Sequence, residues 1–179
     1  TIALRCFPQA IQVTDGFHVQ KLAIEALQDI RIKYWWEAID LENNQIKEAK
    51  SKGKRFIAEE FSNGDSRKLL LARSRYLLYK SPINWTDNQK FRAKILFEEN
   101  PHIKKAFDLV QGLRSIFNTS KSMNIAYTKL AHWYKDVELA GFKSFNTIVN
   151  TISVNYKSIL NYFINRSTNA SADREAATK

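Results

Sequence analysis

Glycine and proline are scarce in this chain, and their scarcity limits what it can fold into. The 179 residues include 5 glycines and 3 prolines, the two residues that most often interrupt a helix. Apolar residues recur at steps of three and four, the spacing that places side chains on one face of a helix. The sequence therefore predicts a mainly α protein of about six helices, with helix above roughly 60% of residues against a usual share of about one third.

The longest helix is predicted over residues 17–52, which contain neither glycine nor proline. Gly53 is expected to end it, and a basic loop should continue through Gly64. One face of this helix is apolar and should be buried. The residues of that face are Val19, Leu22, Ala23, Ala26, Leu27, Ile30, Tyr34 and Ala38.

Local signals define the helices that follow. Further helices are predicted over residues 66–80, from residue 87 onward, and over residues 101–117. After a turn at residues 118–122, another helix should run to residue 139, and a last one is predicted over residues 144–165. Thr86 and Gln89 have the spacing of a capping box, in which each side chain bonds a backbone N–H of the first turn. Asn100 and Pro101 suit the N-cap and first position of a helix, and Gly141 suits a C-cap.

One short segment departs from the helical spacing. Residues 10–15 alternate in character and carry β-branched side chains, a pattern typical of a strand. This is the one strand we predict. Asp15 ends it, so the carboxylate would be held rigidly and would face an open edge. Because an aspartate at such a place is more often a helix N-cap, both interpretations are kept.

The charge of the chain indicates a class of partner. A formal net charge of +10 and a pI near 9.7 predict attraction to polyanions, to nucleic acid before anionic membrane. The candidate phosphate-contacting residues are Lys47, Lys50, Lys52, Lys54, Arg55, Arg67, Lys68, Arg73 and Arg75. A solvated helix face is the alternative for the same residues.

Other residue types exclude several classes of protein. Cys6 is the single cysteine, which rules out an internal disulfide framework and a multi-cysteine zinc site. No apolar run approaches the roughly 20 residues of a membrane span, and a secretory signal pattern is absent, so we expect a cytoplasmic location. Since the first residue is Thr1 and the opening segment resembles the middle of a fold, we interpret the chain as part of a longer protein.

The four tryptophans, Trp35, Trp36, Trp85 and Trp133, allow two interpretations. They could stack on bases of distorted DNA, or they could pack in the core. Core packing is favoured because Trp133 falls within an amphipathic helix.

Three stretches together are similar to the ISL-three family of insertion-sequence transposases. They are residues 7–19, residues 75–86 followed by Asn100-Pro101, and residues 159–163 leading to 166–170. The first is the most specific, because in the family the second triad aspartate ends a core strand and is followed by Phe-His-Val. The similarity covers most of the chain.

This resemblance implies an Asp-Asp-Glu triad on an RNase H-like core. Residues 1–16 would be the end of that core, with Asp15 as the second triad aspartate and a metal ligand. Residues 17–165 would be a helical insertion, and residues 166–179 a loose tail toward the helix of the triad glutamate. His18 occupies the histidine position of an Asp-x-x-His spacing, and Asp173 stands where the glutamate is expected.

The function implied by the resemblance is metal-dependent cutting and joining of DNA at transposon ends, in a bacterial, nucleoid-associated protein that self-associates. Such chemistry needs several carboxylates around Mg²⁺ or Mn²⁺ ions. The first triad aspartate would lie upstream, so the isolated chain is predicted to be inactive and to bind none of these ions. The alternatives are a non-enzymatic helical DNA-binding module and a dimerisation module.

Overall fold

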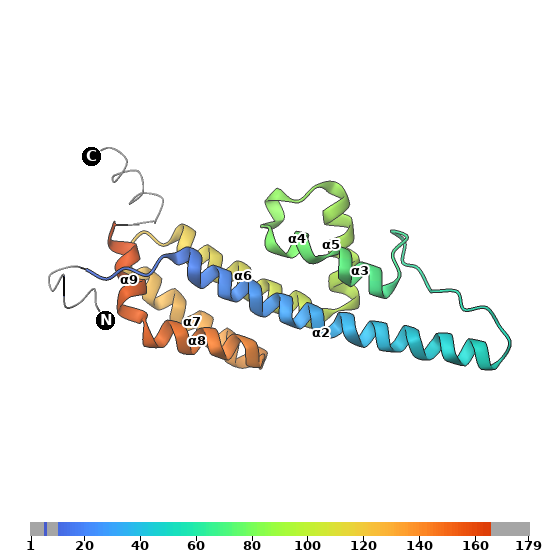
Figure 1. The fold of residues 1–179 in the computed structure, drawn as a ribbon. Helices are drawn as coiled ribbons and strands as arrows, with labels where there is room; N and C mark the ends of the chain where they lie inside the picture. Colours follow the sequence, from blue (N-terminus) through green and yellow to red (C-terminus); the bar gives the residue numbers. More distant parts are fainter. Residues whose placement is uncertain (1–5, 7–10, 166–179) are drawn as a thin grey trace. The chain divides into compact units, whose positions relative to one another are not determined.

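The computed structural model describes Cys6 and residues 11–165, and 79% of the described structure is helical. The mainly α prediction is therefore confirmed. The described part holds the helices α2 (Gly16–Ser51), α3 (Arg67–Arg73), α4 (Arg75–Tyr79), α5 (Asp87–Glu99), α6 (Pro101–Thr119), α7 (Met123–Ala140), α8 (Lys143–Val154) and α9 (Tyr156–Asn165), with a short 3₁₀ turn, η1 (Pro82–Asn84), before α5 (Figure 1).

The chain divides into two compact units. Within the described residues, the first unit comprises Cys6 and residues 11–23 and 109–165, and the second comprises residues 24–108. The boundaries fall inside α2 and α6, so each of these helices contributes to both units. No helix of the described part is long and apolar enough to cross a membrane.

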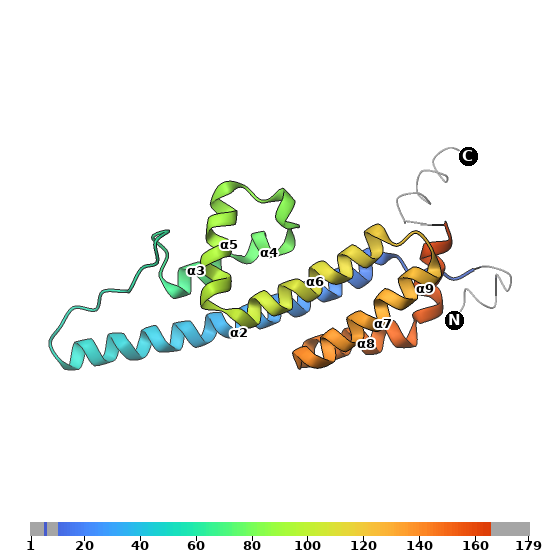
Figure 2. The same ribbon diagram turned by 180° about the vertical axis from the view of Figure 1, so that it is seen from behind.

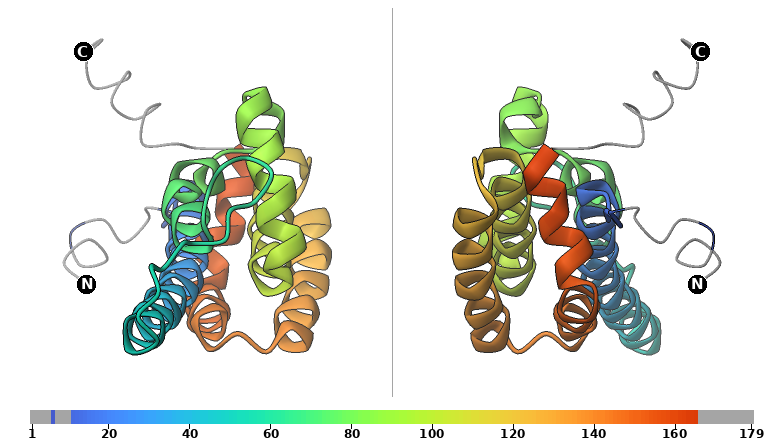
Figure 3. Two further views of the ribbon diagram at one scale, coloured as in Figure 1. Left: turned by 90° about the vertical axis from the view of Figure 1, so that its right-hand side faces the viewer. Right: turned by 90° about the vertical axis from the view of Figure 1, so that its left-hand side faces the viewer.

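In the first unit, α7, α8 and α9 pack against one another (Figure 3). Their apolar faces are buried together with the first turns of α2 and the end of α6, and the Trp133 indole Nε1 donates to the Leu109 carbonyl at 2.8 Å. Gly141 ends α7 with φ of 73°. A left-handed conformation of this kind favours glycine, which explains the predicted cap.

In the second unit, α3 packs against both α4 and α5 (Figure 2). The capping box at the start of α5 is present: Gln89 N donates to Thr86 Oγ1 at 3.3 Å, and Thr86 N donates to Gln89 Oε1 at 3.1 Å. Of the apolar face predicted for α2, Val19, Ala23, Ala26, Leu27 and Ala38 are buried. Leu22 of the same predicted face is exposed.

Two predicted helices are each divided into two. Ser74 separates α3 from α4 and Asn155 separates α8 from α9. At each break a side chain bonds the carbonyl four residues earlier: Ser74 Oγ donates to Leu70 O at 2.6 Å, and Asn155 Nδ2 donates to Thr151 O at 2.9 Å. Such bonds compete with the helical ladder and bend or end helices.

The strand predicted over residues 10–15 is wrong for its described part, residues 11–15, which has no strand conformation. The backbone of this segment bonds to α9 instead. Thr14 N donates to Ser158 O at 2.9 Å, and Asn161 Nδ2 donates to Gln12 O at 2.9 Å. A strand needs a neighbouring strand for its backbone groups, and the described part of the chain offers one isolated β-bridge, Glu60 to Ser66.

Candidate functional site

Asp15 lies at the start of α2 in the first unit and is half-buried. Its Oδ1 accepts a hydrogen bond from Phe17 N at 2.9 Å, and its carbonyl accepts from His18 N at 3.1 Å. This is the geometry of a helix N-cap, in which a side-chain oxygen satisfies an N–H of the first turn. The second carboxylate oxygen makes no hydrogen bond to a described residue.

The segment that carries Asp15 is fixed on both sides. Before it, the hydroxyls of Thr14 and Ser158 lie 2.7 Å apart, and the Thr14 amide also bonds to α9. After it, Gly16 is buried against the ring of Phe117, and a Cβ built on Gly16 would lie 2.5 Å from Phe117 Cδ1. Asp15 is therefore attached to α9 and α6 through its immediate neighbours.

Of the other two predicted catalytic residues, His18 lies within one turn of Asp15 and donates its backbone amide to the Asp15 carbonyl. His18 is on an exposed face of the first turn of α2, with its ring 6.4 Å from that of Phe17. Asp173 lies outside the described residues. No group of three or more His, Cys, Asp or Glu side chains suited to a metal gathers within residues 6 and 11–165. Asp15 fits a metal site as one oxygen ligand, and the remaining ligands would have to come from elsewhere.

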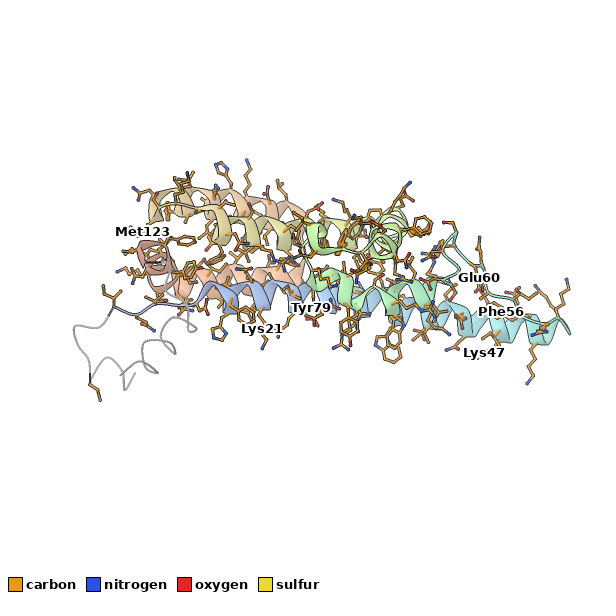
Figure 4. The ribbon with its side chains drawn as sticks, turned by 90° about the horizontal axis from the view of Figure 1, so that it is seen from above. Lys21, Lys47, Phe56, Glu60, Tyr79 and Met123 are labelled. Carbon is orange, nitrogen blue, oxygen red and sulfur yellow. The ribbon has the colours of Figure 1, made fainter. Side chains whose placement is uncertain are left out.

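The predicted DNA-contacting residues fall into two groups. The first group is the basic tip, which we define as Lys47, Lys50, Lys52, Lys54 and Arg55 at the end of α2 and the start of the following loop. All five side chains are exposed, and Figure 4 shows Lys47 near this end of α2. Glu48 pairs with Lys52. The other four form no ion pair within the described part, so their charge is available to a polyanion.

The second group, on α3 and α4, is largely neutralised by acidic neighbours of the same unit. Arg67 pairs with Glu99 at 3.0 Å, and Lys68 pairs with Glu42 at 2.5 Å. Arg73 pairs with Asp65, and Arg75 lies over the ring of Tyr76 at 5.5 Å from its centroid. These contacts compete with phosphate for the same donors.

Asp65 organises the second unit, and sequence reasoning missed it. Its side chain is fully buried and accepts from Arg73 Nη1 at 2.5 Å, Arg92 Nε at 2.9 Å and Asn63 Nδ2 at 2.8 Å. Burial by itself would raise the pKa of Asp65, but the hydrogen bonds and charges of Arg92 and Arg73 hold that pKa below its ordinary value. The signal in the sequence was the turn-forming Asn-Gly-Asp-Ser at residues 63–66.

The buried cation Arg31 stabilises the break between α3 and α4. Arg31 Nε donates to Gln28 Oε1 at 2.7 Å, and Arg31 Nη1 donates to the Leu71 carbonyl at 3.0 Å. Gln28 Nε2 donates to the Arg75 carbonyl at 3.2 Å. Burial lowers the pKa of Arg31, and the positive charge of Arg75 lowers it further. These side chains bond backbone carbonyls on both sides of Ser74 and so stabilise the break.

The structure tests the packing interpretation of the four tryptophans. Trp133 is buried, and Trp85 is half-buried, stacked on Phe107 at 5.5 Å and bonded through Nε1 to the Leu77 carbonyl at 2.8 Å. Both are packing residues, which agrees with the favoured interpretation. Trp35 is half-buried, whereas 55% of Trp36 is exposed.

Comparison with known proteins identifies the class. The family model described as Transposase, of the ISL-three type with an Asp-Asp-Glu triad, matches residues 1–173. The chain is also 31% identical over 114 residues to the transposase for insertion sequence element IS1557 of Mycobacterium tuberculosis, from strain CDC 1551 / Oshkosh and from strain H37Rv. That alignment covers 64% of this chain and 25% of each relative. No solved structure matches.

The chain belongs to the ISL-three transposase family, since the family model covers nearly all of its length. It spans about a quarter of the length of the curated relatives it matches.

Proposed function

We propose that this chain is part of a transposase that cuts and joins DNA at the ends of an insertion sequence, with Asp15 as one metal ligand of the active site. The family membership supports the reaction. The observation that carries the role of Asp15 is its fixed position, with Thr14 bonded to α9 and Gly16 packed on Phe117. A carboxylate held in this way needs little reorganisation to bind a metal.

The chemistry defines what the rest of the parent protein must supply. The reaction would need carboxylates that hold Mg²⁺ or Mn²⁺, and the metal would supply Lewis-acid activation of the reacting oxygens. Asp15 offers one carboxylate, with one oxygen already used by the Phe17 amide. Under this proposal an upstream aspartate and a downstream glutamate complete the site, His18 contacts the scissile phosphate or orients a ligand, and Asp173 stands in for the glutamate.

The proposed division of the parent follows from these roles. Residues 1–16 would join the RNase H-like core, residues 17–165 would form the helical insertion, and residues 166–179 would lead toward the glutamate helix. The parent would self-associate and act on DNA at the bacterial nucleoid.

The catalytic proposal is tested in the full-length parent. We expect cleavage of DNA carrying the element's ends in Mg²⁺ or Mn²⁺, and loss of that cleavage in the Asp15→Asn variant with helix content unchanged. Asparagine also serves as an N-cap, so the substitution removes the charge and keeps the cap. Undiminished cleavage would leave Asp15 as a cap alone. The isolated chain should neither nick nor join DNA.

The chain's own contribution is proposed to be DNA contact through the basic tip. Residues 47–55 contain five basic residues and one acidic residue, a net charge of 5 − 1 = +4. Binding should be independent of base sequence and should weaken steeply with salt, because each phosphate contact releases counterions.

A charge-matched comparison tests this assignment. We expect the variant with Lys47, Lys50, Lys54 and Arg55 all changed to Gln to lose most DNA affinity in fluorescence anisotropy. The slope of the logarithm of its binding constant against the logarithm of salt concentration should become shallower by about 2–4, near 0.9 for each phosphate contact removed. The control changes four exposed lysines of the first unit to Gln; they are Lys121, Lys135, Lys143 and Lys157. Equal losses in both variants would mean that net charge, and not the basic tip, determines binding.

The observation that bears on the non-enzymatic alternative is that the described residues bring together no group of three or more His, Cys, Asp or Glu side chains suited to a metal. If the full-length parent binds DNA through the basic tip but never cleaves it, this alternative replaces the catalytic proposal.

A further inference from the structure

The outer face of α2 carries a heptad pattern that the packing of the second unit does not use. The series runs through positions 32, 36, 39, 43, 46 and 50, in alternating steps of four and three residues. Isoleucine or tryptophan occupies positions 32, 36, 39 and 46, and Asn43 and Lys50 occupy the other two. We name this series the α2 seam. Alternating steps of four and three are the a and d positions of a coiled coil.

The α2 seam is accessible. Ile32 is 38% exposed, Trp36 is 55% exposed and Ile46 is 40% exposed. Ile39 is half-buried, and Asn43 and Lys50 are exposed. The face of α2 that meets its own unit is a different one, marked by the buried Leu27, Arg31 and Ala38. The seam is about 28 Å long at ~1.5 Å per residue, and α2 is unbroken along it (Figure 1).

We propose that the α2 seam pairs with the α2 seam of a second copy of this chain, as a short parallel two-stranded coiled coil. Charge argues for a second copy rather than for DNA. Ahead of the basic tip, residues 32–46 contain one basic and three acidic side chains, a net charge of 1 − 3 = −2, whereas the whole chain carries +10. A polyanion is not attracted to this face, and a second copy is not repelled by it.

Flanking charges select the parallel orientation. In parallel pairing, Glu42 at a g position faces Lys47 at the e position of the second copy, and the reciprocal pair forms by symmetry. Glu42 already pairs with Lys68 of its own unit at 2.5 Å. In the dimer it would therefore contact both Lys68 of its own chain and Lys47 of the second copy. In antiparallel pairing over the whole seam, Lys33 of one copy would instead face Lys47 of the other, and the Asp40 side chains of the two copies would face each other. Like charges in such positions are unfavourable.

Asn43 supports the same orientation. A polar asparagine at an a position lowers the stability of a coiled coil but specifies two strands in register, because the two asparagines meet across the seam. Parallel pairing would also bring both basic tips to the same end of the dimer, since each begins at the last turn of the seam. The dimer would then present Lys54 and Arg55 of both copies to DNA from one end.

The first test is self-association of the chain, measured by sedimentation equilibrium across the micromolar range. We expect a monomer–dimer equilibrium that Ile46→Glu weakens by about tenfold or more, as expected for a charge placed in a buried contact. Ile57→Glu is the matched control, because Ile57 is 82% exposed in the loop, outside the seam. A monomer at every concentration, or equal effects of the two substitutions, would overturn the proposal. Circular dichroism of both variants confirms that each is folded.

Two further measurements address register and the role of salt. In a Cys6→Ser background, Asn43→Cys should form a disulfide-linked dimer readily, and Asn44→Cys, one position off the seam, should not. Equal cross-linking would refute parallel in-register pairing.

Salt should strengthen the dimer, because it screens repulsion between two chains of charge +10, whereas it weakens DNA binding. A dimer that salt dissociates would contradict an apolar seam.

Discussion

Replacing Asp65 with asparagine should lower the stability of the second unit more than any other single loss of charge. Asn keeps the size of the side chain but removes the charge that Arg73 and Arg92 share. Removing one partner of a buried ion pair usually costs about 3–5 kcal/mol. The Arg73 side chain is 55% exposed and that of Arg92 is 24% exposed, so both can regain water. We therefore expect a loss of about 2–3 kcal/mol.

The pH dependence follows from the lowered pKa of Asp65. A carboxyl group whose folded pKa lies below its unfolded value of 3.8 stabilises the fold above that value. The contribution is lost as pH falls below 3.8 through the lower folded pKa. The stability difference between the wild-type chain and Asp65→Asn should therefore be complete at neutral pH and should shrink below pH 3.8.

Thermal and urea unfolding monitored by circular dichroism would measure both effects. The expected loss corresponds to a melting temperature lower by about 4–12 °C for a chain of this size. Asp87→Asn is the matched control, since the Asp87 side chain is 97% exposed in its pair with Lys90 and should change stability by less than about 1 kcal/mol. If the two variants unfold alike, or if their difference persists below the acid transition, Asp65 does not hold the unit together through its charge.

Three further substitutions test local packing and capping. Gly16→Ala should lower the free energy of unfolding by about 1–3 kcal/mol, because the added Cβ would meet Phe117. The control is Gly112→Ala, whose Cβ would lie an ordinary 3.5 Å from Trp133 and should not destabilise the fold. Equal unfolding free energies for the two variants would contradict the contact. Thr86→Ala should cost about 1 kcal/mol through loss of the capping box, with Thr86→Ser close to wild type in urea unfolding. Asp15→Ala should cost about 1 kcal/mol and Asp15→Asn much less, and a large loss in the asparagine variant would show that the charge stabilises the fold.

Local signals in the sequence were enough to predict most helix ends. The capping box of Thr86 and Gln89, Pro101 at the first position of α6, and the left-handed Gly141 after α7 all depend on neighbours within one turn. Such interactions form in the same way whatever surrounds the helix. The mainly α class followed for the same reason.

The tertiary structure decided what depends on distant partners. Ser74 ends α3 where Arg31 and Gln28 of α2 donate to the Leu71 and Arg75 carbonyls. Residues 11–15 bond to α9 rather than to another strand. The sequence alone showed which residues are basic. The fold determined that Arg73 is paired with buried Asp65 while the basic tip is exposed, because an ion pair forms only between side chains that folding brings within reach.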